Sequence, residues 1–139
     1  MTFVTHMFLH GGWMHLFGNL WFLWIFGDNV EDRLGPLKFL VIYLGWGFAA
    51  AATQLIFDGN PNVPMVGASG AIAGVLGAYA VLYPKARVHT VLFLFVFITR
   101  ITLPAFALLA FWFGYQFWSM GEVGIAWWAH IGGLSLIHI

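Results

Sequence analysis

Two residues capable of nucleophilic chemistry stand inside strongly apolar sequence. Ser69 lies in the run Gly67-Ala68-Ser69-Gly70, at the start of a glycine-rich apolar segment, and His130 lies in a later apolar segment. A serine hydroxyl becomes nucleophilic when a neighbouring base accepts its proton, and imidazole has a suitable pKa. Because an ionisable group within a membrane span is costly and usually functional, the pair predicts a Ser69–His130 dyad.

Each residue also has a simpler explanation. A serine that follows turn residues such as Pro64 and Gly67 is ordinarily an N-cap that accepts a backbone N–H, and a membrane histidine can hydrogen-bond a neighbouring carbonyl. The two residues together favour catalysis. All the acidic residues fall in expected loops, so no carboxylate is available to orient the imidazole, and a dyad without a third member is predicted. These acids are Asp28, Glu31, Asp32, Asp58 and Glu122.

Donors for a tetrahedral oxyanion are the next requirement, because preorganised donors in a dry site are often the largest catalytic term. His15 and Asn19 are four residues apart, which places both on one face of a helix otherwise rich in Trp, Leu and Phe. With the backbone N–H of Ser69 they form a candidate oxyanion site. Interhelical hydrogen bonding that holds the bundle together is an equally open role for His15 and Asn19.

A stripe of small residues follows the serine. Gly70 and Gly74 are one helical turn apart, and Gly133 follows the histidine. Small residues let two helices approach closely. We therefore expect Gly70, Gly74 and Gly133 to pack the serine and histidine helices together, as a short Ser69–His130 hydrogen bond requires.

The composition places these residues in a lipid bilayer. Of the 139 residues, 62% are hydrophobic and 7% are charged, against roughly a quarter charged in soluble domains. Spans of about 20 residues leave room for four or five crossings, so one bundle is predicted. The net charge of zero gives no indication of nucleic acid binding.

Metal and thiol chemistry are not expected. The chain has no cysteine, which removes disulfides and thiolate sites. His6, His10 and His15 could suggest a metal site, but no acid or cysteine completes the ligand set. A histidine metal site is therefore given little weight.

Breaks in the apolar sequence predict an all-α, polytopic membrane helix bundle. Residues 88–98 are expected to form a short interfacial or buried piece. The expected spans cover about residues 13–26, 37–57, 69–83 and 103–118, with a fifth from about 125. Positive charges put the loops around Arg33 and Lys85 in the cytoplasm. Ser69, His130 and His15 then lie at similar depth near the outer side.

Both ends of the chain carry a prediction. The start lacks the basic region, apolar core and cleavage site of a signal peptide, and it resembles sequence from within a protein. The final run Leu134-Ser135-Leu136-Ile137-His138-Ile139 is the translation of a common transposon sequencing adapter. We therefore expect one transmembrane domain over residues 1–133, incomplete at its N-terminus, and adapter read-through over residues 134–139.

Taken together, these motifs resemble the rhomboid intramembrane serine proteases. Their order and spacing make the combination specific, although each is short. The resemblance covers nearly the whole chain and aligns it with helices two to six of a six-helix core, so five of six expected spans are present. The matching runs are His15-Leu16-Phe17-Gly18-Asn19, Glu31-Asp32-Arg33-Leu34-Gly35, Gly67-Ala68-Ser69-Gly70 and Ala129-His130-Ile131-Gly132-Gly133.

The resemblance implies a role for each site residue. Ser69 is expected to be the nucleophile, His130 the general base, and His15, Asn19 and the Ser69 backbone the oxyanion site. The implied substrate is a single-pass membrane protein whose helix unwinds near small or helix-breaking residues, and no cofactor or metal is implied. The expected location is a prokaryotic inner membrane, and the oligomeric state is not indicated.

The chain also departs from the family pattern. Well-known members carry a tyrosine four residues after the serine that stacks on the histidine, whereas this chain has Ala73, with Trp127 or Trp128 as candidate replacements. The family's first helix and the Trp-Arg pair of the following loop are missing. Two other functions remain open: a catalytically inactive relative that binds transmembrane helices, and a transporter whose histidines relay protons. The transporter would need intramembrane acids, which the expected spans lack.

Overall fold

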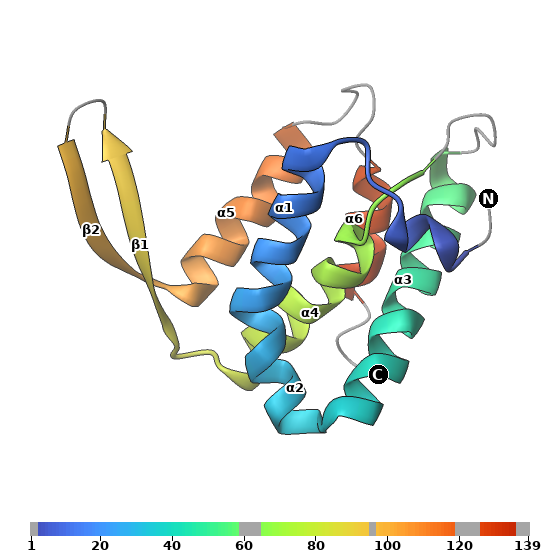
Figure 1. The fold of residues 1–139 in the computed structure, drawn as a ribbon, viewed down its shortest axis with the longest axis horizontal. Helices are drawn as coiled ribbons and strands as arrows, with labels where there is room; N and C mark the ends of the chain where they lie inside the picture. The colour runs from blue at the N-terminus through green and yellow to red at the C-terminus, as the bar shows by residue number, and fades with distance from the viewer. Residues whose placement is uncertain (1–2, 59–64, 95–96, 119–125, 136–139) are drawn as a thin grey trace.

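The computed structural model describes residues 3–58, 65–94, 97–118 and 126–135. After a short 3-10 turn at Thr5–Phe8, this part of the chain is mostly helical and carries one antiparallel hairpin. Figure 1 shows α4 in the middle of the bundle, where it contacts the other helices. The elements are α1 (Trp13–Phe22), α2 (Asp28–Leu34), α3 (Pro36–Asp58), α4 (Ser69–Leu82), β1 (Arg87–Leu94), β2 (Phe97–Pro104), α5 (Ala105–Trp118) and α6 (Trp127–Ser135).

The first helix is longer than the sequence predicts. A π-helical turn over Leu23–Gly27 joins α1 to α2, so the chain stays helical up to Leu34 instead of entering a loop near Gly27. Polar residues can continue a helix when they face outward, and the break comes at the next Gly-Pro pair. Gly35 adopts a φ of 81°, a conformation that favours glycine. Pro36 then supplies the fixed φ suited to the first residue of α3.

Helices α3 and α4 begin and end within one residue of the expected spans. Among the described residues, one helix, Pro36–Phe57, is long and apolar enough to cross a membrane. Ser69–Leu82 and Ala105–Tyr115 are shorter apolar helices. By length and composition, α3 is consistent with a helical membrane architecture.

The hairpin departs from the all-α expectation. Strands β1 and β2 pair with Arg87 opposite Pro104 and Leu94 opposite Phe97, where a short interfacial or buried piece was expected. The segment is rich in β-branched and aromatic residues, which favour extended pleated backbone. Figure 1 shows the hairpin beside α5, projecting from the bundle. Helix α5 begins directly after β2, at Ala105.

The core is built around α4. Val75 and Leu76 of this helix are fully buried, as is Val30 of α2. Large apolar side chains also cover the outside of the bundle, and Trp13 and Ile56 are 76% and 73% exposed. Water does not favour so much exposed apolar surface, whereas the hydrocarbon of a bilayer does.

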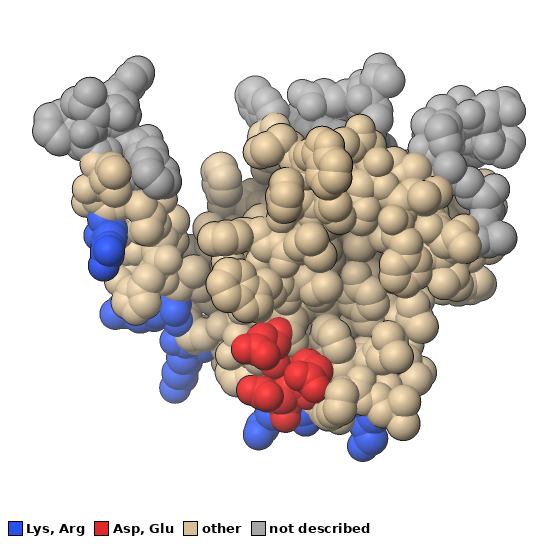
Figure 2. Space-filling model, viewed as in Figure 1, with Lys and Arg blue, Asp and Glu red and all other residues tan. Residues whose placement is uncertain are grey.

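Charged side chains gather at one end of the bundle. Among the described residues visible in Figure 2, the charged side chains of the bundle lie at its lower end, and further cations lie on the hairpin. Arg33 and Lys38 flank the turn from α2 to α3, and Lys85 and Arg87 lie where α4 leads into β1. Figure 1 places both junctions at this same end, whereas Ser69 begins α4 on the side away from it.

Candidate active site

Ser69 is the first residue of α4, and a strained turn presents it. Gly67 has a φ of 113°, which favours glycine over residues with a side chain. Its N–H donates to the carbonyl of His6 at 2.9 Å, so the N-terminal 3-10 turn holds this loop. Ala68 is the N-cap residue and makes no side-chain capping bond. The Ser69 hydroxyl is therefore not used as the N-cap of α4.

His130 of α6 meets the serine. Its Nε2 lies 2.7 Å from Ser69 Oγ, and the histidine side chain is buried, with 8% exposure. A hydroxyl can donate to an unprotonated imidazole nitrogen at this distance. The two side chains that the sequence singled out, from helices far apart along the chain, are thus in hydrogen-bonding contact inside the bundle.

Glycine makes the close approach of α6 to α4 possible. A Cβ on Gly133 would overlap the carbonyl oxygen of Gly70. Gly70 and Gly74 also face a third helix, because a Cβ on either would collide with Ala50 or Trp46 of α3. The stripe was expected to pack against α6, and it also packs against α3.

Helix α3 also supports α6 directly. Oε1 of Gln54 accepts a hydrogen bond from the N–H of Ala129 at 3.1 Å. Phe57 stacks on Trp128 with ring centroids 4.6 Å apart. This role of α3 was not predicted from the sequence. Gln54, a polar residue near the end of an apolar span, is the signal that could have indicated it.

His15 lies against the loop that precedes the serine. Its Nδ1 accepts a hydrogen bond from the N–H of Gly11 at 3.3 Å. A Cβ on Gly67 would lie 2.9 Å from Nε2 of His15, so glycine at position 67 makes room for this ring. The ring of His15 therefore lies beside Gly67, which precedes Ser69 by two residues.

Asn19 is buried on the same helix as His15. Its side-chain amide donates to the carbonyl of His15 at 2.8 Å. Both residues belong to α1, so this hydrogen bond does not link α1 to another helix. The amide has a second N–H. This local bond fixes the orientation of the Asn19 side chain.

The aromatic ring beside His130 comes from an unexpected residue. The ring of Trp112, in α5, lies 5.5 Å from the imidazole, centroid to centroid, with the planes inclined by 48°. Trp128 instead stacks on Phe57, and the Trp127 side chain lies outside what the structure describes. Ala73 is buried in α4 and offers no ring. No sequence motif marked Trp112.

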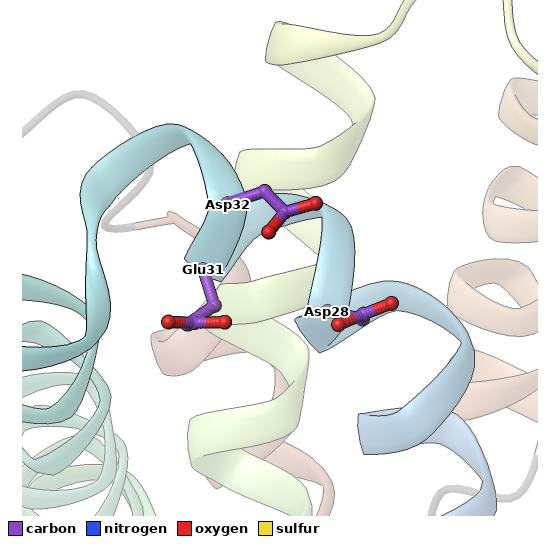
Figure 3. A group of neighbouring side chains, drawn as sticks. All are labelled: Asp28, Glu31 and Asp32. Carbon is purple, nitrogen blue, oxygen red and sulfur yellow. The ribbon is translucent and has the colours of Figure 1, made fainter.

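One acidic cluster has the spacing of metal ligands but lies away from the serine. Carboxylate oxygens of Asp28, Glu31 and Asp32 come within 4.8 Å of one another, and Figure 3 shows the three side chains projecting from α2. Exposed acids of this kind are ordinarily solvated. Within the described ranges the histidines form no such group, and His10 packs edge-on against His15 with centroids 5.3 Å apart.

Comparison with known proteins identifies the family. A family model described as the rhomboid domain matches residues 1–136. Rhomboid protein 1, mitochondrial, of Saccharomyces cerevisiae is 30% identical over 96% of this chain and 38% of its own length. Rhomboid protease GlpG of Yersinia pseudotuberculosis is 30% identical over 96% of this chain and 44% of its own length. Inactive RHOMBOID-like protein 8 of Arabidopsis thaliana is 35% identical over 54% of this chain and 21% of its own length.

The chain belongs to the rhomboid family. This family is integral to membranes and includes serine proteases that act on membrane protein substrates within the bilayer. The chain spans less than half the length of each of these three relatives. Relatives named as mitochondrial or chloroplastic occur beside bacterial ones, so the family alone does not assign a compartment.

Proposed function

We propose that this protein is an intramembrane serine endopeptidase that cleaves transmembrane segments of single-pass membrane proteins. The observation that carries the proposal is the 2.7 Å contact between Ser69 Oγ and His130 Nε2. It joins a group that can attack a carbonyl to a group that can accept its proton. Membership of the rhomboid family supports the same activity.

In the proposed mechanism, the Ser69 hydroxyl transfers its proton to Nε2 of His130 while Oγ bonds to the scissile carbonyl carbon. The tetrahedral oxyanion accepts hydrogen bonds from the side chains of His15 and Asn19 and from the N–H of Ser69. The carbon–nitrogen bond then breaks, and His130 returns the proton to the leaving amine. Water that loses a proton to His130 then attacks the acyl-enzyme. The bond between Oγ and the acyl carbon breaks, His130 returns the proton to Ser69 Oγ, and the second product leaves as a carboxylic acid.

The hydrogen bond from Gly11 supports the oxyanion role of His15. Because Nδ1 accepts that bond, the neutral ring carries its proton on Nε2. This nitrogen is the one beside Gly67. A donor is thereby directed to the loop that presents Ser69, where the proposed mechanism needs one.

The proposal extends to the membrane setting. Residues 1–133 form the transmembrane domain, with five spans in a prokaryotic plasma membrane and the Ser69 end of the bundle toward the outside. The exposed apolar side chains support a bilayer environment. The cations around Arg33 and Lys85 support a cytoplasmic location for the opposite end, and the bacterial relatives support the compartment.

An active-site fluorophosphonate probe tests the proposal on the full-length protein. We expect the wild-type protein to be labelled, Ser69→Ala to abolish labelling and His130→Ala to slow it strongly. Thr102→Ala is the matched control, because Oγ1 of Thr102 pairs with Nδ1 of His89 on the exposed hairpin at 3.1 Å, and its labelling should equal that of the wild type. Labelling that persists in Ser69→Ala refutes the assignment of the nucleophile.

A catalytically inactive rhomboid that binds transmembrane helices is the second candidate. The relative named inactive favours it. Such a protein would bind a transmembrane peptide, and its Ser69 would not react with the probe. The contact between Ser69 and His130 favours the enzyme, because binding alone does not require a serine joined to a base.

A further inference from the structure

Trp112 connects the histidine to another part of the bundle. Its ring lies 5.5 Å from the His130 imidazole and 6.4 Å from the ring of Phe22, centroid to centroid. Phe22 ends α1, the helix that carries His15 and Asn19. The indole of α5 therefore lies between the histidine helix and the helix of the candidate oxyanion residues.

The imidazole of His130 must keep one orientation if it is to accept the proton of Ser69. A histidine side chain rotates about two bonds and has several allowed rotamers, so each further contact on the ring restricts its orientation. Ala73, one helical turn after the serine, supplies a methyl group only. Trp128 is engaged with Phe57. The ring of Trp112 is the aromatic group that lies against the His130 imidazole in the described part of the chain.

We propose that Trp112 is a positioning residue that holds the His130 imidazole with Nε2 toward Ser69 Oγ. The inference rests on the proposed proteolytic function. Aromatic rings attract one another when their centroids lie about 4.5–7 Å apart and the rings are not face to face, and the rings of Trp112 and His130 lie 5.5 Å apart with their planes inclined by 48°. The face of an indole also attracts a cation within about 6 Å, so the contact is compatible with the imidazolium that forms when His130 takes up the proton of Ser69.

Two substitutions of Trp112, by leucine and by phenylalanine, distinguish a role of the aromatic ring in positioning His130 from a role in packing alone. In the full-length protein in liposomes, Trp112→Leu should lower kcat for a transmembrane substrate about tenfold with KM unchanged, and it should slow fluorophosphonate labelling of Ser69 similarly. Trp112→Phe keeps an aromatic ring and should retain both rates within about threefold. Phe111→Leu is the matched control, because Phe111 of the same helix is 74% exposed and should leave both rates unchanged.

The outcomes distinguish failure of the positioning role of Trp112 from failure of the proposed proteolytic function. Equal losses in Trp112→Leu and Trp112→Phe, or an unchanged kcat in Trp112→Leu, overturn the positioning role. Absence of labelling at Ser69 in the wild-type protein overturns the proposed function instead. Thermal unfolding of each variant reports on folding, and Trp112→Met, also without a ring, takes the place of the leucine variant if that one does not fold.

Discussion

The side-chain carbonyl of Gln54 accepts a hydrogen bond from the backbone N–H of Ala129 at 3.1 Å. Ala129 lies in the first turn of α6, and its N–H also donates to the carbonyl of Ala126 at 3.0 Å, so the two acceptors share this N–H. Helix α3 thus caps the helix that carries His130, although α3 contributes no residue to the proposed chemistry. The placement of the candidate base therefore depends on a third helix.

Removal of this cap should destabilise the protein and slow its reaction. Gln54→Met keeps the length of the side chain and removes one of the two acceptors of the Ala129 N–H, which retains its bond to the carbonyl of Ala126, at an expected cost of about 0.5–1.5 kcal/mol in the free energy of unfolding. Unfolding in detergent and the rate of Ser69 labelling measure the two effects. Leu55→Met changes an outward-facing neighbour that is 51% exposed and should change neither. Wild-type stability in Gln54→Met would contradict the capping role.

Gly133 should tolerate no side chain. Because a Cβ there overlaps the carbonyl oxygen of Gly70, Gly133→Ala forces α6 away from α4 and lengthens the contact between Ser69 and His130. We expect about 1–3 kcal/mol of destabilisation, as in other overpacked cores, and loss of most probe labelling. A Cβ on Gly114 of α5 meets open space, so Gly114→Ala should leave labelling intact. Equal labelling of the two variants would argue against the close helix contact.

The turn before the serine should be equally restrictive. Gly67→Ala places a Cβ at a φ of 113° and against the ring of His15. Strain of about 1–3 kcal/mol is typical of such backbone, and the displaced ring would weaken the oxyanion site, so kcat should fall. Gly12→Ala provides the comparison, because no atom lies near its Cβ position. Steady-state cleavage of a transmembrane substrate measures both variants, and a Gly67→Ala enzyme with normal kcat would count against the arrangement.

Asn19 has a matched partner elsewhere in the chain. Both Asn19 and Asn29 donate their side-chain amide to the carbonyl four residues earlier, at 2.8 and 3.1 Å. If Asn19 also donates to the oxyanion, Asn19→Ala should lower kcat roughly 10²–10³-fold, whereas Asn29→Ala should have little effect. Determination of kcat and KM for each variant tests this expectation. Similar kcat values for the two would assign Asn19 a local structural role.

The sequence was sufficient for features that depend on local signals. Helix α3 lies between the Gly35-Pro36 break and the polar turn that follows, and α4 lies between Gly67 and Pro84, so their bounds could be predicted. The pairing of Ser69 with His130 could also be anticipated, because polar side chains in apolar spans need partners and glycines mark a close helix contact.

Features that depend on tertiary packing could not be predicted in this way. The apolar run that forms the hairpin has no periodicity that separates a buried strand from a short helix. Trp112 is one of several aromatic residues in an apolar helix, and its neighbour is decided by how α5 lies against α6. The capping bond of Gln54 likewise joins residues with a large separation in sequence.

The π-helical turn at Leu23–Gly27 adds one residue relative to a regular α-helix. Since each residue turns an α-helix by about 100°, the insertion rotates every side chain after it by that angle. His15 and Asn19 before the turn, and Val30 after it, can thereby all point into the same bundle. One continuous helix thus presents two independently oriented faces, and a single-residue deletion inside the turn would bring them out of phase.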